Sequence, residues 1–557
     1  MIYVFAFWGL ISLLFIATGM LGEAALSKLT SPKPSSIPQN AELKPAFSGI
    51  IGITIWACLA NWLSLWLPLG KLSYFLFLAV LFISGWAFLL AKRSKFSFIS
   101  PCFTPLSCIA FALIFFTVLI KSASPSEIGD EGGYFLPYIK WIESFPTVPG
   151  LANLQGRFGY NSIWHSTAAL FSFRELISNP FYELNGLVII LFAWHSIFET
   201  AEEKPYLRAV YLLLPALLFR SFITSSAADT PTIFVSYLFV LSMWKLISTP
   251  QTPDWEVKFS LSCLLFGFLV TTKTSNAILV FLFAPAFAII FRQYSKANVV
   301  RILAILSSIA VLFIVPWIVR FYVSTGFLIF PIHQIDLFNP DWKVSSGTIM
   351  DESYAVTGFA RNEHIPVDRA ATQTLLEWVP GWIARAGAKG LSFIALILSG
   401  TIATALMAKR SILTRLETIL LVSVMLAIVI WFYKFPAFRF GFGFILPYVL
   451  LTHSKLFFTF TKRKDIFLKV ALLTMALFSA VSFMRSSFGN SVSVSEILVR
   501  QAPFPSVDLE SLKVGGMDFY RGQLLWDSPL PGILPWKKLD FSPRGTALID
   551  GFRFESH

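Results

Sequence analysis

Long apolar runs alternate with short polar segments along most of the chain. Runs of about 18 or more apolar residues are long enough to cross a bilayer as helices. Such runs lie at 2–21, 47–69, 72–91, 103–120, 182–198, 206–223, 230–247, 259–272, 277–291, 302–323, 391–408, 416–433, 440–458 and 466–484. The pattern therefore predicts an all-α polytopic membrane protein with about 12–14 transmembrane helices.

One apolar stretch is too long for a single span. It runs from 259 to 291 and is interrupted by Thr271–Asn276, which contains Lys273. A charged residue at the centre of a bilayer costs about 2.5–3.5 kcal/mol on insertion scales. We therefore divide the stretch into two spans and place Lys273 at a membrane face.

The composition agrees with a membrane protein. The 557 residues are 56% hydrophobic and only 13% charged, whereas soluble domains carry about 25% charged residues. The net charge of +13 does not indicate a nucleic acid partner, because the basic residues recur at the ends of apolar runs. The four cysteines lie in or beside apolar segments, so we expect neither a disulfide framework nor a zinc site. They are Cys58, Cys102, Cys108 and Cys263.

The basic loops predict how the spans are oriented. Four basic clusters fall on one side of the predicted spans, which the positive-inside rule makes the cytoplasmic side. The clusters are Lys92, Arg93 and Lys95; Arg292, Lys296 and Arg301; Lys409, Arg410 and Arg415; and Lys455, Lys462, Arg463 and Lys464. The acidic turn from Glu199 to Glu203 also lands inside, against the rule. Loops 121–181 and 324–390 and a proline-bearing, loop-rich tail from 485 to 557 then lie outside.

An acidic pair in the first outer loop is the strongest candidate for chemistry. Asp130 and Glu131 follow the span exit, and glycines flank them, so the backbone can turn sharply and approach a ligand. The next residues have the amphipathic spacing of a helix in the interface plane, where Trp and Tyr are favoured. A carboxylate at that depth can act as a general base. Alternatively, the pair caps the helix that follows.

This arrangement resembles the first periplasmic loop of GT-C-type glycosyltransferases. The segment Gly267–Leu279 is similar to the Gly-Leu-Ala-x-Leu-Thr-Lys-type segment of many members, and seven spans between two large outer loops match the family's module over roughly 103–390. Segments 153–165 and 434–443 also resemble a large, little-characterised bacterial polytopic family. On this resemblance the chain has extra N-terminal helices (1–102), a GT-C-like core (103–390), C-terminal helices (391–484) and the tail (485–557).

The resemblance implies an enzyme of the bacterial cytoplasmic membrane that takes a sugar from a polyprenyl-phosphate carrier. Asp130 is the expected base, and Glu131 its neighbour or a metal contact; the use of a divalent metal stays open. The expected contacts to the lipid phosphate are Lys273, Arg439, Arg220 and Arg320, for which snorkelling to lipid headgroups is the alternative. The expected contacts to the substrate are Tyr134, Tyr138, Arg157, Asn161, His165 and Asp229.

Several of these residues have a purely structural alternative. Asp229 also suits the N-terminus of the next helix. Asn161 and His165, four residues apart, would share a helix face, and a single buried histidine is usually a packing residue. The second outer loop offers further polar residues, but their spacing singles out none of them. They are Asp351, Glu352, His364, Asp368 and Arg369.

The sequence leaves three functions open. The first is transfer of a sugar to an envelope glycan, lipid or protein on the outer face. The second is transport of a lipid-linked sugar across the membrane, although nearly all charges lie at span ends rather than mid-span. The third is polymerisation or ligation of an envelope polysaccharide. The absence of phosphate-loop, zincin and nucleophile-elbow motifs disfavours an ATP-driven pump, a zinc protease and a serine hydrolase.

Overall fold

The protein is a multi-pass membrane protein built almost entirely from helices. The computed structural model describes residues 1–30, 44–93, 103–126, 128–177, 179–218, 223–250, 252–461, 463–488 and 493–555. Within these ranges, 11 helices are long and apolar enough to cross a membrane. The prediction of an all-α polytopic protein is confirmed at this level.

All predicted spans contain helix in the described residues. The 11 long ones are α1 (Ile2–Thr30), α2 (Pro45–Leu63), α4 (Pro105–Ala123), α9 (Asp229–Ser248), α10 (Trp255–Thr272), η6 (Thr274–Phe283) with α11 (Ala284–Gln293), α12 (Lys296–Thr325), α15 (Leu375–Lys409), α16 (Arg415–Lys434), α17 (Phe438–Phe460) and α18 (Lys464–Phe488). Three further predicted spans form α3 (Ser73–Arg93) after η1 (Leu69–Leu72), α7 (Leu184–Trp194) continued by η5 (His195–Glu199), and α8 (Pro205–Leu218).

The helix break at Lys273 is where the sequence places it. Lys273 has an extended backbone (φ −153°, ψ 117°) between α10 and η6. The Asn276 side chain donates to the carbonyl of Leu269 at 3.0 Å and so satisfies a carbonyl at the end of α10. A comparable kink, at Gly387 (φ 58°), separates the first part of α15 from its apolar part, Gly390–Lys409.

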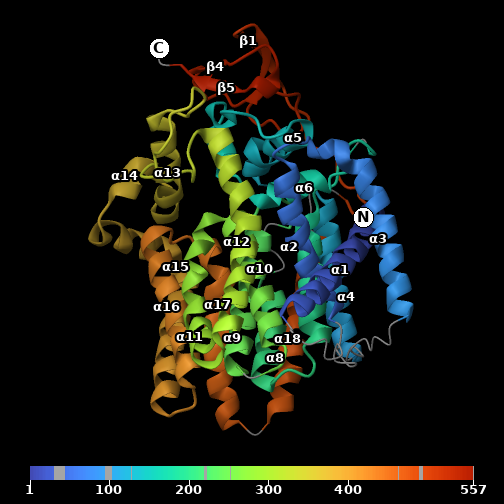
Figure 1. Ribbon diagram of the computed structural model, residues 1–557, viewed down its shortest axis with the longest axis vertical. Helices are drawn as coiled ribbons and strands as arrows, with labels where there is room; N and C mark the ends of the chain where they lie inside the picture. Colours follow the sequence, from blue (N-terminus) through green and yellow to red (C-terminus); the bar gives the residue numbers. More distant parts are fainter. Residues whose placement is uncertain are drawn as a thin grey trace.

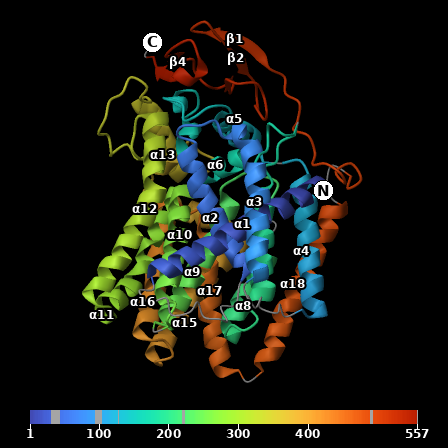
Figure 2. The ribbon, with the colours of Figure 1, turned by 45° about the vertical axis from the view of Figure 1, so that its right-hand side comes forward.

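The two ends of the helix bundle differ in character (Figures 1 and 2). The tail and the helices of the two long loops lie at one end, which we call the tail end, and the C-terminal ends of α3, α11, α15 and α17 lie at the opposite end. The members of the predicted basic clusters that the structure describes therefore share one end of the bundle; Lys95 and Lys462 lie outside the described residues. The N-terminus lies near the tail, since the backbone N–H groups of Ile2 and Tyr3 donate to Leu498 and Val499 at 3.0 and 3.1 Å.

The acidic turn that departs from the positive-inside rule has a structural reason. Glu199 accepts a hydrogen bond at 2.7 Å from the backbone N–H of Ala46, at the start of α2, where a helix favours negative charge. Glu203 forms ion pairs with Lys245 and Lys44. Both carboxylates therefore have stabilising partners within the protein, so they do not weigh against the orientation.

Short helices of the two long loops cover the tail end of the bundle. The first loop contains η2 (Glu131–Phe135), α5 (Leu136–Ser144), η3 (Leu151–Asn153), η4 (Gly156–Tyr160) and α6 (Ile163–Leu170), and the second contains α13 (Ser346–Arg361) and α14 (Val367–Thr372). The expectation that α5 lies in the membrane interface is wrong. Tyr138, Trp141, Ile142 and Glu143 are all buried, because α5 packs between the bundle and the tail.

The tail is loop-rich, as expected, and also contains a small β-structure. A three-stranded sheet has the order β1 (Glu510–Val514), β2 (Met517–Arg521), β3 (Gly532–Ile533), with β1 and β2 antiparallel and β2 and β3 parallel. The antiparallel pair β4 (Phe541–Pro543) and β5 (Phe552–Phe554) flanks η7 (Leu548–Asp550). Phe519, Phe541 and Phe552 form its aromatic core.

Candidate functional site

The acidic pair divides between two environments. Asp130 forms an ion pair with Arg157 at 2.7 Å and keeps 42% of its side chain exposed. Glu131 is buried and accepts hydrogen bonds from the hydroxyls of Ser225 and Ser226 at 2.5 and 2.7 Å. Successive residues of a helix project about 100° apart, so neighbouring carboxylates reach different partners.

Burial changes the protonation of Glu131. Removal from solvent raises its pKa to about 7, although the serine hydrogen bonds and the backbone N–H of Ser226 favour the charged form. Both carboxylate oxygens accept hydrogen bonds from residues 225 and 226. Glu131 therefore ties the turn before α9 to η2, and Asp130 is the member of the pair that a substrate can reach.

The glycine after the pair is used for close packing with the tail. The carbonyl of Gly132 accepts hydrogen bonds from the backbone N–H groups of Leu525 and Trp526 at 2.8 and 3.0 Å. A Cβ at Gly132 would lie 2.5 Å from the Trp526 ring. The backbone at Gly132 does make the close approach that we expected, but to the Trp526 indole of the tail and not to a ligand. The i→i+5 geometry of η2 is typical of functional irregularities in helices.

Arg157 joins the first outer loop to the second. Its guanidinium lies 5.2 Å from the centre of the Tyr134 ring, in addition to its contact with Asp130. The nearby Tyr160 hydroxyl donates to Glu352 of α13 at 2.5 Å, and Arg157 interacts electrostatically with Glu352. Burial raises the pKa of Glu352 above its usual range. Glu352 is thus the residue of the second loop that reaches the site.

A second group of charges comes from three spans. Lys273, between α10 and η6, forms an ion pair with Asp229 at the start of α9, at 2.8 Å. The Lys273 ammonium also lies 3.8 Å from the centre of the Phe440 ring in α17. Arg439 lies 5.1 Å from the same ring. Asp229 directly follows the N-cap Ala228 and lies in the first turn of α9, so its carboxylate suits the helix N-terminus and also pairs with Lys273.

Tyr134 lies where the two groups meet. Burial raises the pKa of its phenol well above the usual range; Asp130 and Asp229 raise it further, and Arg157 and Arg439 oppose them. All four charges therefore lie within electrostatic range of one hydroxyl. We call this set the tail-end cluster. Its members are Asp130, Tyr134, Arg157, Tyr160, Asp229, Lys273, Glu352, Arg439 and Phe440.

The chain matches the profile of a known protein family, and the match includes the whole tail-end cluster. The profile described as a domain of unknown function (DUF8201) matches residues 1–446. The chain belongs to the DUF8201 family. Every residue of the tail-end cluster falls within the DUF8201 match, and the tail lies beyond it. No curated protein matches the chain.

Two residues that we expected at the site, Arg320 and Tyr138, lie apart from the tail-end cluster. The Arg320 side chain is buried and donates to the hydroxyls of Ser64 and Tyr138, the latter at 3.3 Å. Tyr138 stacks on Phe158. Arg320 and Tyr138 therefore hold the first outer loop against α2 and α12 instead of facing the charged residues around Tyr134.

Asn161 and His165 are packing residues as well. Asn161 has a left-handed backbone (φ 46°) and donates to the Trp317 carbonyl at 2.7 Å. Because α6 begins only at Ile163, Asn161 and His165 do not share a helix face. His165 is buried, and burial lowers its pKa to about 3, so the imidazole is neutral. Arg220, the remaining expected phosphate contact, lies outside the described residues.

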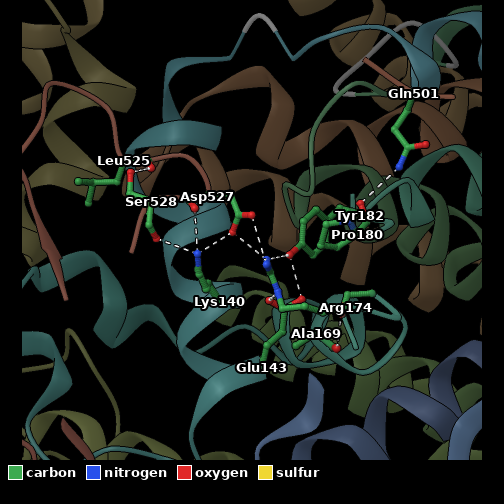
Figure 3. Close-up of polar contacts among 11 residues, drawn as sticks. Lys140, Glu143, Ala169, Arg174, Pro180, Tyr182, Gln501, Leu525, Asp527 and Ser528 are labelled. Atoms are coloured by element: carbon green, nitrogen blue, oxygen red, sulfur yellow. Dashed lines mark hydrogen bonds and ion pairs between the residues drawn. The ribbon is translucent and has the colours of Figure 1, made fainter. Parts of the chain in front are cut away.

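The tail is fixed to the DUF8201 region by a partly buried ionic clamp (Figure 3). Asp527 accepts two hydrogen bonds from Arg174, at 2.8 and 3.2 Å, and forms an ion pair with Lys140 at 3.0 Å. Arg174 also donates to Glu143 of α5 at 2.5 Å and to the Tyr182 hydroxyl at 2.7 Å. The clamp holds the tail directly above the helix that carries Asp130.

Sequence reasoning named Glu352 without singling it out, and missed Tyr160 and the clamp. No local motif marks these residues, because their partners are up to 387 positions away along the chain. Within the described residues, no group of three His, Cys, Asp or Glu side chains is arranged to hold a metal ion. The tail-end cluster offers one exposed carboxylate, Asp130, beside three cations and two partly buried phenols.

Proposed function

We propose that the protein is a GT-C-type integral membrane glycosyltransferase. It moves a sugar from a polyprenyl-phosphate carrier to a glycan, lipid or protein acceptor, on the face of a bacterial cytoplasmic membrane that the tail covers. One observation carries the proposal. The exposed carboxylate of Asp130 and the cation Arg439 both act electrostatically on Tyr134, and Arg439 and Lys273 both act on Asp229, so the carboxylate and the two cations belong to one connected group.

Asp130 is the proposed catalytic base. Its carboxylate is the exposed member of the acidic pair, and Arg157 holds it in place at 2.7 Å. A positioned carboxylate accepts the proton of the acceptor hydroxyl as that oxygen attacks the sugar. The Tyr134 hydroxyl, surrounded by charges of both signs, orients the acceptor.

Lys273 and Arg439 are the proposed contacts to the carrier phosphate. Both lie around the Phe440 ring, close to the end of α10 and the start of α17, and we place the carrier phosphate against these two side chains. The Asp229 carboxylate fixes the ammonium of Lys273. Fixed cations stabilise the negative charge that develops on a leaving phosphate.

The proposed reaction is a single displacement at the anomeric carbon. The bond from that carbon to the phosphate oxygen breaks, and its electron pair leaves with the polyprenyl phosphate beside Lys273 and Arg439. The acceptor oxygen forms the new bond and loses its proton to Asp130. Atoms and charge balance without a redox partner or a nucleotide.

Lipid analysis of the purified protein tests the proposal. We expect mass spectrometry to find a polyprenyl phosphate, or its sugar-linked form, bound to the wild-type chain. The double variant Lys273→Ala, Arg439→Ala should lose most of it, whereas Lys434→Ala, which changes an exposed lysine at the same end, should retain it. If the wild-type protein carries ordinary phospholipids only, the donor assignment is wrong.

A further inference from the structure

A recess lies on the other side of the acidic pair from the tail-end cluster. It is enclosed by the segment after α4, the turn before α9 and the tail, and its free space of about 510 Å³ includes the open mouth. Glu131 forms part of its wall, whereas its neighbour Asp130 faces Arg157. The pair thus separates the charged cluster from a second, distinct compartment.

The recess has walls rich in hydroxyl groups. Six serine and threonine residues line it: Ser122, Ser124, Ser126, Thr224, Ser225 and Ser226. The Ser122 hydroxyl is buried and has no hydrogen-bond partner in the described part of the chain. Hydroxyls both donate and accept hydrogen bonds, and an unmade bond of a buried hydroxyl is costly, so this wall is suited to a polar ligand.

Two carboxyl groups add acceptors to the same wall. Glu131 and Glu183 both line the recess, and burial raises their pKa values to about 7 and about 8. Near neutral pH such groups exist partly in the protonated form, which donates as well as accepts. No lysine, arginine or histidine is among the lining residues that the structure describes. This combination disfavours a phosphate or another anion and favours a neutral ligand.

The tail supplies the apolar part of the recess. Trp526 and Phe504 line it from that side, and Trp526 is held by the backbone hydrogen bond to Gly132 and by the adjacent Asp527 clamp. Aromatic rings offer broad apolar surfaces of fixed orientation. A sugar ring presents the complementary features: apolar C–H faces and a rim of neutral hydroxyls.

We propose that this recess binds a sugar residue of a glycan, and that the glycan is the acceptor. The assignment of the glycan as the acceptor rests on the proposed transferase function; Glu131 lines the recess, and the preceding residue in the chain, Asp130, is the proposed base. The tail, which lies outside the DUF8201 match, would then select the acceptor, while residues of the matched region handle the donor.

Binding of the full-length, detergent-solubilised protein to an array of bacterial envelope glycans tests the inference. We expect the wild-type chain to bind a defined group of glycans, and Trp526→Ala and Glu183→Gln to lose binding by at least about tenfold. Trp536→Ala is the matched control, because Trp536 is a tail tryptophan that is 70% exposed and outside the recess; it should bind as the wild type does.

A second variant separates a filled recess from a loosened tail. Ser126→Trp adds bulk at the recess without removing a contact of the Asp527 clamp, and it should also abolish glycan binding while leaving the melting temperature unchanged. The inference would be overturned if Trp526→Ala and Ser126→Trp both bound glycan as tightly as the wild type. It would also be overturned if the wild-type chain bound no glycan.

The two proposals fail in distinguishable ways. Glycan binding that depends on Trp526 and Ser126, in a protein that never turns over a polyprenyl-phosphate sugar, would refute the transferase and leave the recess as a glycan site. Sugar transfer by the wild type with glycan binding unaffected by Ser126→Trp would keep the transferase and place its acceptor elsewhere.

Discussion

Asp130 and Glu131 show how adjacent residues of the same type acquire different roles. The sequence pairs them, but the fold exposes Asp130 beside Arg157 and buries Glu131 beneath Ser225 and Ser226. Electrostatics follow from that difference: an exposed, ion-paired carboxylate is available to a substrate, and a buried one retains its proton more strongly. Which member of the pair is available depends on the turn before α9, nearly 100 positions away.

The buried carboxyl predicts a pH-dependent stability. In the unfolded chain Glu131 titrates near its usual value of 4.5, and in the folded protein near 7. Between these values the folded state holds the proton that the unfolded state has released, so the free energy of unfolding falls as pH rises from 4.5 to 7 and levels off above 7. The full loss is about 3 kcal/mol. Thermal unfolding in detergent across this range should show the decline, and in Glu131→Gln the decline should be smaller by this amount, because the buried Glu183 still contributes its own; equal pH profiles would contradict the burial of this group.

The lysine at the break between α10 and η6 predicts a catalytic defect. Lys273→Ala removes the ammonium that lies against Asp229 and Phe440, and with it charge stabilisation of the leaving phosphate. We expect kcat/KM for a polyprenyl-phosphate sugar to fall by at least about 100-fold. Lys434→Ala should stay within about twofold of the wild type, since an exposed side chain contributes little. An unchanged rate for Lys273→Ala would remove this lysine from the mechanism.

At the level of elements, the tail and the first outer loop form one unit. The β-structure of the tail contacts η2 through Gly132, α5 through Lys140 and the second loop through the Arg544–Asp341 ion pair at 2.7 Å. A three-stranded sheet with a two-stranded partner has little core of its own. Its order therefore depends on these contacts, and the helix that carries Asp130 depends on the tail in return.

Loss of the clamp should loosen this unit. Asp527→Asn removes the carboxylate shared by Arg174 and Lys140, which we expect to destabilise the docked tail by about 1–3 kcal/mol. Hydrogen exchange should rise in residues 510–533 and in α5, while the membrane helices keep their protection. Asp518→Asn, at an exposed position of β2, is the control. Unchanged exchange in Asp527→Asn would show that the clamp does not hold the tail.

For the whole molecule, the sequence predicted the membrane-spanning helices but not the arrangement of the site. Apolar runs and the Lys273 break predict the spans, because a bilayer imposes both length and charge constraints on each helix separately. The local sequence pattern gave the wrong environment for α5, because its spacing does not reveal that the C-terminal tail covers its outer side. It also misassigned Arg320 and His165, whose side chains are buried in the fold. Glu352 was among several equivalent polar residues until α13 placed it against Tyr160.

The orientation of the molecule gives a direct prediction. In a chain whose native cysteines are replaced, Ser506→Cys in the tail should react with a membrane-impermeant maleimide in intact cells. Lys296→Cys, at the start of α12, should react only after the membrane is opened, because basic loops remain in the cytoplasm. The reverse labelling pattern would place the tail-end cluster in the cytoplasm and refute an outward-facing transferase.

Sugar transfer by the Asp130→Asn variant tests the central claim most directly. With purified protein in lipid nanodiscs, a labelled polyprenyl-phosphate sugar and a mixture of envelope glycans, the wild type and the exposed-site control Asp508→Asn should transfer label at similar rates. Asp130→Asn should fold normally and transfer at least about 100-fold more slowly, as expected for the loss of a general base. Transfer by Asp130→Asn at the wild-type rate would contradict the account.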